Sequence, residues 1–418
     1  MKGSIDANPS CGKTMAEPLL SIEGAEVRRG MGVVLSSFNL QLDSKDIIIL
    51  HGENGAGKST VIEVAARLLP LEHGAVNHHG SLTFHSDGRR INPIRPFGLT
   101  LQENGVIGSE TIHNHLTTVA NHAGKDLEVE PLLEAYGLGH RTHDLIAHLS
   151  GGQARKVAVL AGLIPAMVSE KPTLVLLDEP DAGLDEKALN TFVLHVQSLA
   201  AAGHGFLIAS HNPTVISTGT HLHDLASKKP QASTSADAWG RIGRPSNKAR
   251  LLTRTGHRYS ASTRSGLARN GLAALMVLGC VLALGDPSIL PPGLWVTGGI
   301  LAPAFAAGLA GDPTTSLMRE QRAEDWWRAN GQRIPSAVGL GLTIGAAMTL
   351  LSSYIFTGGV ELNLVLLGAV IGELSMIGMR LLHNSIRRLA RPNAVFVRLL
   401  MPAFILPWAL AVSLAAGW

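Results

Sequence analysis

The stretch Gly52-Glu53-Asn54-Gly55-Ala56-Gly57-Lys58-Ser59 is a complete G-x-x-x-x-G-K-S pattern. The apolar run Ile47-Ile48-Ile49-Leu50 precedes it, and a helical pattern from Val61 to Leu69 follows it. A strand, a glycine loop and a helix in this order form the context in which the pattern binds phosphate. We therefore predict a phosphate-binding loop at the start of a helix.

Each part of this loop has a chemical role in holding a nucleotide. Glycines let backbone N–H groups turn inward around a phosphate, and the helix N-terminus adds a positive partial charge. Lys58 can reach the β- and γ-phosphates, and Ser59 can ligate Mg²⁺, so the predicted cofactors are ATP and Mg²⁺. The predicted nucleotide-binding residues of the loop are Gly52, Asn54, Gly55, Gly57, Lys58, Ser59 and Thr60.

A pair of acidic residues follows a second apolar run. Thr173-Leu174-Val175-Leu176-Leu177 is unbroken by polar residues other than its first, as expected of a parallel strand buried on both faces. It leads into Asp178 and Glu179, at the strand end where α/β sheets bind ligands. We predict that Asp178 holds Mg²⁺ and that Glu179 polarises the attacking water as a general base.

A third motif lies between these two. Leu149-Ser150-Gly151-Gly152-Gln153 precedes a helical stretch from Ala154 to Ile164, which makes a second anion-binding helix start. Residues 18–226 thus resemble the nucleotide-binding domain of an ATP-binding cassette (ABC) protein, and Leu149–Gln153 matches the signature loop of that family. The predicted ligand residues of this loop are Ser150, Gly151, Gly152 and Gln153.

The resemblance implies roles for three further residues. Gln102 matches the Q-loop glutamine, which contacts Mg²⁺ and senses the membrane domain. Asp185 matches the D-loop aspartate, and His211, after the run Phe206–Ala209, matches the switch histidine that contacts the γ-phosphate. The implied catalytic residues are Glu179, His211 and Gln102. The implied metal ligands are Ser59, Gln102 and Asp178.

One position departs from the family pattern. Many members stack adenine on an aromatic residue ahead of the phosphate loop, whereas this chain has Val27-Arg28-Arg29-Gly30 there. Either the guanidinium of Arg28 or Arg29 stacks on the base, or both are solvated arginines at a strand end. Arg28 is retained as a predicted nucleotide contact.

The resemblance also implies a partner. In this family the signature loop closes over the ATP of another cassette. One phosphate loop and one signature in the chain therefore predict a homodimer, or a heterodimer with a close paralogue, that encloses two ATP molecules.

Composition divides the chain into regions. Its 418 residues carry 35 Lys and Arg against 32 acids, a near-neutral balance that argues against a dedicated nucleic-acid binder. Charged residues make up 16%, below the roughly 25% of soluble domains, and the deficit lies after residue 265. We predict an α/β P-loop NTPase fold followed by an all-α transmembrane domain. The predicted boundaries are a loose tail at 1–17, the cassette at 18–226, a linker at 227–265 and the membrane domain at 266–418.

The predicted linker is basic. It contains one acid, Asp237, and is rich in Ser, Thr, Gly and Pro. Such a segment either approaches the anionic cytoplasmic leaflet or is a flexible solvated connection. Its basic residues are Lys228, Lys229, Arg241, Arg244, Lys248, Arg250, Arg254, Arg258 and Arg264.

Five apolar segments follow, each approaching the roughly 20 residues that cross a bilayer. The alternative, a set of buried soluble helices, leaves too few polar positions to cover a soluble surface. The candidate spans are Leu267–Leu284, Leu294–Leu309, Ala337–Phe356, Leu362–Leu382 and Phe396–Ala416.

Loop charge predicts the orientation. The loops Ala310–Ser336 and His383–Val395 contain arginines, whereas Gly285–Gly293 and Thr357–Glu361 contain no Lys or Arg. We therefore predict a multi-pass protein of the cell membrane with its cassette on the cytoplasmic side.

Two features of the apolar region suggest function. Residues 318–328 mix both charges with Trp326 and Trp327, so they either form a helix that docks beside Gln102 or anchor at the lipid headgroups. Glu373 lies near the middle of the fourth span, where a carboxylate either serves transport or makes a structural interhelical hydrogen bond.

The resulting prediction is one half of an ATP-driven transporter, with export favoured over import and an unknown small-molecule cargo. The cassette resembles the haem-exporter type of cytochrome c biogenesis in Glu53–Lys58 and in its missing aromatic, and Pro292–Val296 is similar to that system's membrane subunit. The alternatives are a lipid or drug exporter, and a membrane-anchored ABC ATPase that transmits force without transport.

Overall fold

The computed structural model describes most of the cassette and much of the apolar region. The described residues are 17–29, 32–225, 230–232, 244–245, 267–283, 292–319, 322–331, 337, 339–388 and 412. They fall into two compact units. The first lies within 1–102, 162–242 and 329–331, and the second within 103–161, 243–328 and 332–418.

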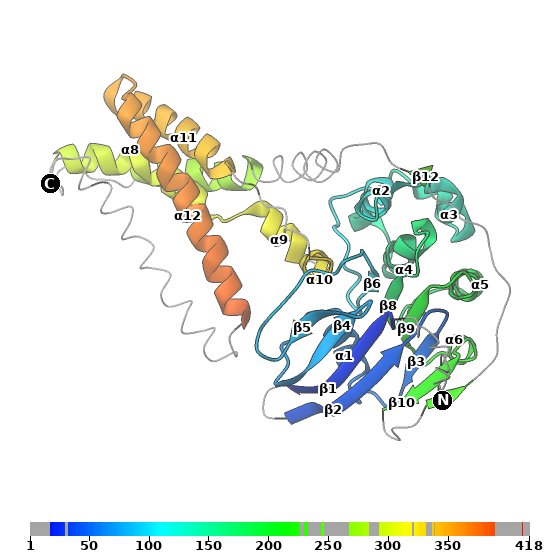
Figure 1. Ribbon diagram of the computed structural model, residues 1–418. Coiled ribbons are helices and arrows are strands. Elements are labelled where there is room, and N and C mark those ends of the chain that lie inside the picture. Colours follow the sequence, from blue (N-terminus) through cyan, green and yellow to red (C-terminus); the bar gives the residue numbers. More distant parts are fainter. Residues whose placement is uncertain are drawn as a thin grey trace, which may run out of the picture. The chain divides into compact units, whose positions relative to one another are not determined.

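The first unit is built on a six-stranded sheet of order β11-β10-β3-β9-β8-β6 (Figure 1). All neighbours from β10 to β6 are parallel, and β11 is antiparallel to β10. Every residue of β8 and β9 is buried, which confirms the strands predicted from their apolar runs. The strands are β3 (Ile47–His51), β6 (Gly98–Thr100), β8 (Leu174–Asp178), β9 (Gly205–Ala209), β10 (His221–Asp224) and β11 (Pro230–Ala232).

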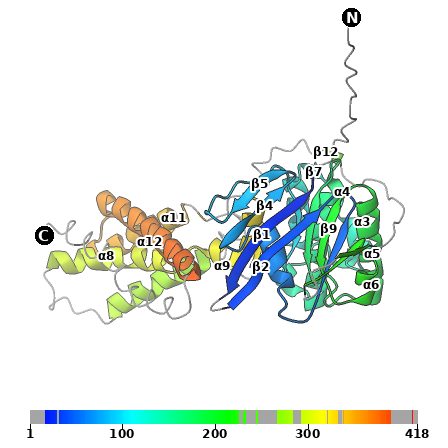
Figure 2. The same cartoon turned by 60° about the horizontal axis from the view of Figure 1, so that its bottom comes forward.

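A second sheet in this unit is antiparallel, with the order β2-β1-β4-β5 (Figure 2). Its strands are β1 (Leu20–Arg29), β2 (Gly32–Leu42), β4 (His73–His78) and β5 (Ser81–His85). The helices α5 (Glu186–Ala201) and α6 (Pro213–Ile216) follow β8 and β9 along the chain. The unit therefore has the α/β fold expected from its sequence.

Helix α1 is shorter than predicted. It covers Lys58–Ala65, whereas the apolar pattern continued to Leu69. Arg67 has a φ of +61°, a left-handed conformation that interrupts a right-handed helix. The backbone at Arg67, which the hydrophobic pattern does not reveal, therefore ends the helix.

The second unit contains the signature helix α4 (Gly151–Val168), whose last residues belong to the first unit. It also contains α2 (Ile112–His122), α3 (Glu130–Ala135) and the strand pair β7 (Lys125–Asp126) and β12 (Arg244–Pro245). The five described residues of the predicted linker lie in β11 and β12. The rest of the linker and residues 1–16 of the predicted tail lie outside the described residues.

The apolar region of this unit is helical. The first candidate span is the helix Leu267–Ala283, and α9 (Pro313–Arg319) and α10 (Ala323–Ala329) lie in the loop after the second span. By length and apolarity, the helix Leu340–Thr357 and the segment Leu362–Leu382 can cross a membrane. The fifth candidate lies outside the described residues apart from Val412. The second to fourth candidates correspond to α8 (Pro292–Leu309), α11 (Leu340–Thr357) and α12 (Leu362–Arg388).

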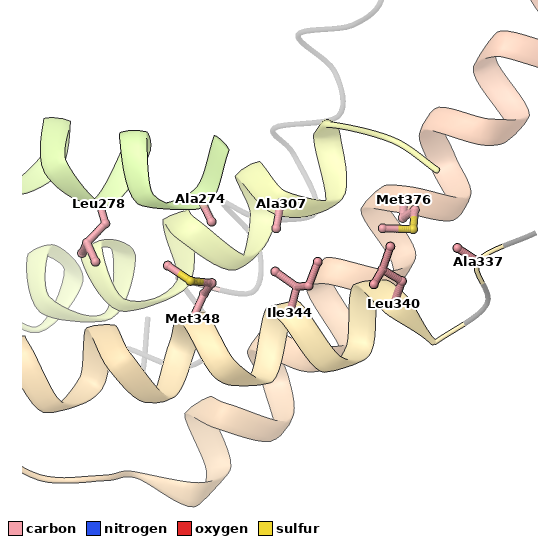
Figure 3. Close-up of a cluster of buried hydrophobic side chains, with 8 residues drawn as sticks. All are labelled: Ala274, Leu278, Ala307, Ala337, Leu340, Ile344, Met348 and Met376. Atoms are coloured by element: carbon pink, nitrogen blue, oxygen red, sulfur yellow. The ribbon is translucent and has the colours of Figure 1, made fainter. Parts of the chain in front are cut away.

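These helices pack through small and aliphatic residues. Eight buried side chains from four helices and the approach to α11 form one cluster (Figure 3). A Cβ on Gly345 would lie 2.5 Å from the carbonyl oxygen of Gly368, and one on Gly372 would lie 2.5 Å from that of Gly341. Only glycines allow α11 and α12 to approach this closely, as in many pairs of transmembrane helices.

Glu373 connects the same two helices. Its Oε1 accepts from the N–H of Gly339 at 3.3 Å, and its Oε2 accepts from the N–H of Leu342 at 3.2 Å. A carboxylate at the first turn of α11 satisfies unpaired N–H groups there and complements the helix dipole. The geometry therefore supports the structural alternative for Glu373.

His78 occupies a buried position between the sheet and α1. Its Nε2 lies 2.8 Å from the carbonyl oxygen of Ala65, and its ring packs edge-to-face on Phe97. Burial, with a smaller effect of the Arg67 charge, lowers the pKa of His78 to about 3. The folded chain therefore keeps this imidazole neutral.

We predict that acidification destabilises the cassette through His78. The unfolded histidine binds a proton below about pH 6.5, while the folded one does not until about pH 3, so stability is present above pH 6.5 and is lost below it. Urea unfolding of the full chain between pH 7.5 and 5 measures this slope. His78→Gln should reduce it by up to about one proton, or about 1.4 kcal/mol per pH unit. The exposed His140→Gln is the control, and equal slopes in both variants would contradict the assignment.

Candidate nucleotide-binding site

The predicted site residues of the first unit lie at one edge of its large sheet. Because β3, β6, β8 and β9 are parallel, their carboxyl ends meet at the same edge. Gly52 follows β3, Glu179 follows β8, and Ser210 follows β9, while Gln102 lies two residues after β6. The fold thus brings together groups that lie far apart in the sequence.

The phosphate loop has the backbone that its glycines predict. Gly52, Gly55 and Gly57 have φ angles of +142°, +87° and +101°, which other residues rarely adopt. Gly57 directly precedes α1 and leaves the first N–H groups of the helix without a side-chain cap. The loop therefore presents N–H donors at a helix N-terminus, the arrangement that binds phosphate.

Lys58 lies under this loop. Its Nζ donates to the carbonyl oxygens of Gly52 at 2.7 Å and Glu53 at 2.9 Å, and the side chain is only 6% exposed. These bonds hold the ammonium group inside the curve of the loop, where the β- and γ-phosphates are expected. Thr60 is buried next to it along α1, and Asn54 is exposed at the tip of the loop.

Ser59 and Asp178 meet at the base of the site. The Ser59 hydroxyl donates to Asp178 Oδ1 at 3.1 Å, and Asp178 is only 2% exposed. A hydroxyl and a buried carboxylate oxygen are ligands that suit Mg²⁺. The donor set therefore fits the predicted metal, and Gln102, exposed at the same sheet edge, completes the predicted ligands.

Glu179 has an unusual backbone. Its φ is +49°, and its N–H donates to the carbonyl oxygen of Ala209 on the neighbouring strand at 2.8 Å. A left-handed non-glycine residue costs about 1–2 kcal/mol, and such strain persists mainly at functional sites. The turn places Glu179 directly beyond Asp178 at the sheet edge. This observation supports its predicted role as general base.

His211 is held by a buried serine that was not predicted as a site residue. The Ser210 hydroxyl donates to Asp181 Oδ1 at 2.7 Å and accepts from the N–H of Asn212 at 3.0 Å. These bonds join the turns after β8 and β9 on either side of the exposed His211. The His211 ring also faces His51 at 6.1 Å, edge-to-face. Ser210 and His51 each lie at the end of a predicted strand, and this position is the sequence signal that could have revealed them.

Comparison with known proteins agrees with this geometry. The ABC transporter family model matches residues 35–182. The cytochrome c biogenesis ATP-binding export protein CcmA of Gluconobacter oxydans is 32% identical over 210 residues, covering 50% of this chain and 88% of the relative. The chain belongs to the ABC transporter family. Its cassette is therefore an ABC ATPase domain, which binds and hydrolyses ATP.

Other relatives differ in length and in role. The zinc import ATP-binding protein ZnuC of Brucella suis is 27% identical over 233 residues, or 54% of this chain and 72% of that protein. An ABC transporter ATP-binding protein of Streptomyces avermitilis is 32% identical over 203 residues, or 47% of this chain, which spans only 34% of that relative. One relative is named for export and another for import, so these names determine neither direction nor cargo.

The signature loop of the cassette begins α4 in the second unit. The N–H of Ser150 donates to Gln153 Oε1 at 3.1 Å, and the N–H of Gln153 donates to Ser150 Oγ at 3.4 Å. This reciprocal pair is a capping box, which satisfies two N–H groups of the helix start. Ser150 and Gly151 are themselves exposed. A Cβ on Gly151 would meet nothing within 4 Å, so packing within the described chain does not require glycine there.

Two further predicted contacts have structural partners. Asp185 accepts from the N–H of Ala188 at 2.8 Å and caps α5, so its D-loop role stays a prediction. Arg28 lies 3.2 Å from Glu72, and Arg29 pairs with Glu63. Both arginines thus face carboxylates, and stacking of Arg28 on adenine also stays a prediction.

We predict that Lys58→Ala weakens ATP binding by about ten- to a hundredfold. The substitution removes charged hydrogen bonds to phosphate, each worth about 1.5–3 kcal/mol. Equilibrium binding of a fluorescent ATP analogue to the full chain measures the loss. Lys187→Ala, on the exposed face of α5, is the matched control and should bind as the wild type does. Equal affinity in the two variants would remove Lys58 from the site.

Proposed function

We propose that this chain is one half of an ABC transporter, in which ATP hydrolysis at the cassette drives movement of solute through its C-terminal helices. The observation that carries the proposal is the sheet edge at which Lys58, Asp178 and the strained Glu179 gather, in a chain whose later helices are long and apolar enough to cross a membrane.

In this proposal each group of cassette residues has its own role in ATP hydrolysis. The loop N–H groups and Lys58 bind and orient the phosphates, and His211 supports the γ-phosphate. Glu179 takes a proton from the attacking water at its carboxylate. Ser59, Asp178 and Gln102 would hold Mg²⁺, which neutralises phosphate charge when bound. Ser210, bonded to Asp181, keeps the turn that carries His211 in place beside Glu179.

A second cassette completes the site in this proposal. The capping box engages the N–H groups of Ser150 and Gln153, whereas Gly151 between them is exposed and has open space around it. Packing within the described chain does not explain a glycine at this position, whereas a phosphate group bound by a partner cassette does. The expected assembly is a homodimer or a pair of close paralogues with two shared ATP sites.

The C-terminal helices form the membrane part. Only 44% of the most apolar stretch in each of α11 and α12 is buried within the described chain. α12 exposes an apolar residue at nearly every turn of one stripe, and lipid is the natural cover for such a surface. The exposed residues of this stripe are Leu362, Leu366, Val370, Leu374 and Leu381.

The predicted cytoplasmic loop contacts the residue next to Gln102. Arg322 Nε lies 3.2 Å from Glu103 Oε2, and Glu103 directly follows Gln102. Trp326 is buried and packs edge-to-face on His122 at 5.4 Å. Trp327 is also buried, which supports docking of this loop over anchoring at lipid headgroups. In this proposal the loop transmits closure of the cassettes to the spans.

Two observations bear on direction and cargo. Fusion of the membrane part to the cassette favours export, and one similar relative is named as an export protein of cytochrome c biogenesis. We therefore propose export, with a haem-type cargo as the first candidate and a lipid or drug as the second. The proposed location is the cell membrane with several passes and a cytoplasmic cassette.

We predict that Glu179→Gln keeps ATP binding but lowers turnover by about 100-fold or more, since general-base catalysis contributes about 10²–10⁴-fold. The variant should accumulate as a dimer with trapped ATP, because the sites close but do not reset. Phosphate release by the full chain in lipid vesicles measures turnover, and light scattering of the chain in detergent measures the dimer.

The same vesicles test transport. Wild-type chain should move a haem or lipid probe in an ATP-dependent manner, and Glu179→Gln should not. ATP turnover without movement of any probe would favour a force-transmitting ATPase. Full turnover in Glu179→Gln would remove this residue from the base role. A chain that is soluble without detergent would exclude the membrane assignment.

We predict that Glu103 and Arg322 are energetically coupled. The pair is partly exposed, so the expected coupling is about 0.2–1 kcal/mol. Hydrogen exchange of α10 in Glu103→Ala, Arg322→Ala and the double variant forms a double-mutant cycle. Non-additive effects confirm docking through this pair, whereas additive effects would show that the two residues act independently.

A further inference from the structure

Arg67 combines a backbone conformation that favours glycine with a deeply buried arginine side chain. It follows α1, and its φ of +61° is a conformation that glycine adopts without cost. The same conformation costs an arginine about 1–2 kcal/mol of backbone strain. Yet the side chain of Arg67 is 1% exposed, so it is among the most deeply buried arginines of the described residues. Such a combination indicates that the guanidinium itself is needed at this position.

The guanidinium joins three distant parts of the chain. Its Nη1 donates to the carbonyl oxygen of Ile91 at 2.5 Å, and its Nη2 donates to that of Ala329 at 2.5 Å. Burial and the charge of Arg90 lower the pKa of Arg67 to about 10, so it stays protonated near neutral pH. Ala329 is the last residue of α10, and cations are favourable at a helix C-terminus.

The two residues after Ala329 are also built into the cassette. Asn330 is 5% exposed, and its Oδ1 accepts from the N–H of Phe97 at 3.3 Å. Gly331 has a φ of +68°, and a Cβ on it would lie 2.6 Å from Asn92 Oδ1. Residues 329–331, named here the inserted tripeptide, therefore belong to the first unit although their neighbours in sequence belong to the second.

The inserted tripeptide contacts residues next to both elements that lead to the nucleotide-binding site. Arg67 lies just beyond the end of the helix whose first residue is Lys58. Phe97 directly precedes β6, which leads to Gln102. On the other side, the chain continues from Gly331 to α11, which begins at Leu340. A shift of α1 on nucleotide binding would thus pull on the tripeptide, which the chain joins to α11.

We propose that Arg67 is a positioning residue that fixes the inserted tripeptide to the phosphate-loop helix and so transmits nucleotide binding to α11. This inference rests on the proposed transport function. It adds a contact through α1 and Arg67, which is separate from the pair of Glu103 and Arg322.

Hydrogen exchange of the full chain with and without MgATP tests the proposal. Arg67→Gly suits the left-handed backbone and removes the whole side chain, including the guanidinium. Without nucleotide, we expect exchange across the inserted tripeptide to rise about tenfold or more, because the charged hydrogen bond from Arg67 to Ala329 is lost. ATP affinity should be unchanged, and the MgATP-dependent change in α11 should disappear. Arg89→Ala, an exposed arginine in a turn, is the matched control.

Three results would overturn the proposal. The first two are unchanged exchange of the tripeptide in Arg67→Gly and a MgATP effect on α11 that persists in this variant. The third is loss of ATP affinity, since Arg67 would then shape the nucleotide site. Should Arg67→Gly fail to fold, Arg67→Lys, which keeps the charge with a single donor group, should show a partial effect.

The proposed function fails in a different way. Wild-type chain that binds MgATP without any change in α11 would refute the proposed coupling of ATP to the membrane helices. Exchange of the inserted tripeptide without nucleotide would still decide whether Arg67 holds it in place.

Discussion

The parallel pairing of β3, β9 and β8 is the constraint on which the rest of the cassette depends. It aligns three carboxyl ends in register, so that the phosphate loop, the acidic pair and His211 emerge side by side. The bond from Ser59 to Asp178 then ties the start of α1, which follows the loop after β3, to the end of β8 across the intervening strand. A slip of one residue in this register would turn every side chain to the other face and separate these groups.

The core strands and the phosphate loop could be predicted because local chemistry and burial agree there. Strands buried on both faces read as unbroken apolar runs, so β3, β8 and β9 were predictable from Ile47–Leu50, Thr173–Leu177 and Phe206–Ala209. The phosphate loop was predictable because it requires left-handed backbone conformations that glycine adopts more readily than other residues. Lys58, Ser59 and Asp178 indeed lie together in the structure.

Features that depend on contacts between residues far apart in the chain could not be predicted. The end of α1 depends on the left-handed backbone of Arg67, whose buried side chain reaches a carbonyl 262 residues away. β11 pairs with β10, and β12 pairs with β7. The basic, glycine- and serine-rich sequence of this segment does not indicate either partner. The role of Ser210 required knowing that the turns after β8 and β9 adjoin. Periodicity and composition contain none of this information.

The edge strands of the six-stranded sheet affect how readily the protein aggregates. An open edge exposes unpaired backbone groups and invites other chains to add strands, which leads to aggregation. Here one outermost strand, β11, is three residues long and starts with Pro230, which has no N–H to offer a further strand. The opposite outermost strand, β6, is also only three residues long. Two such short margins discourage extension of the sheet by strands of other chains.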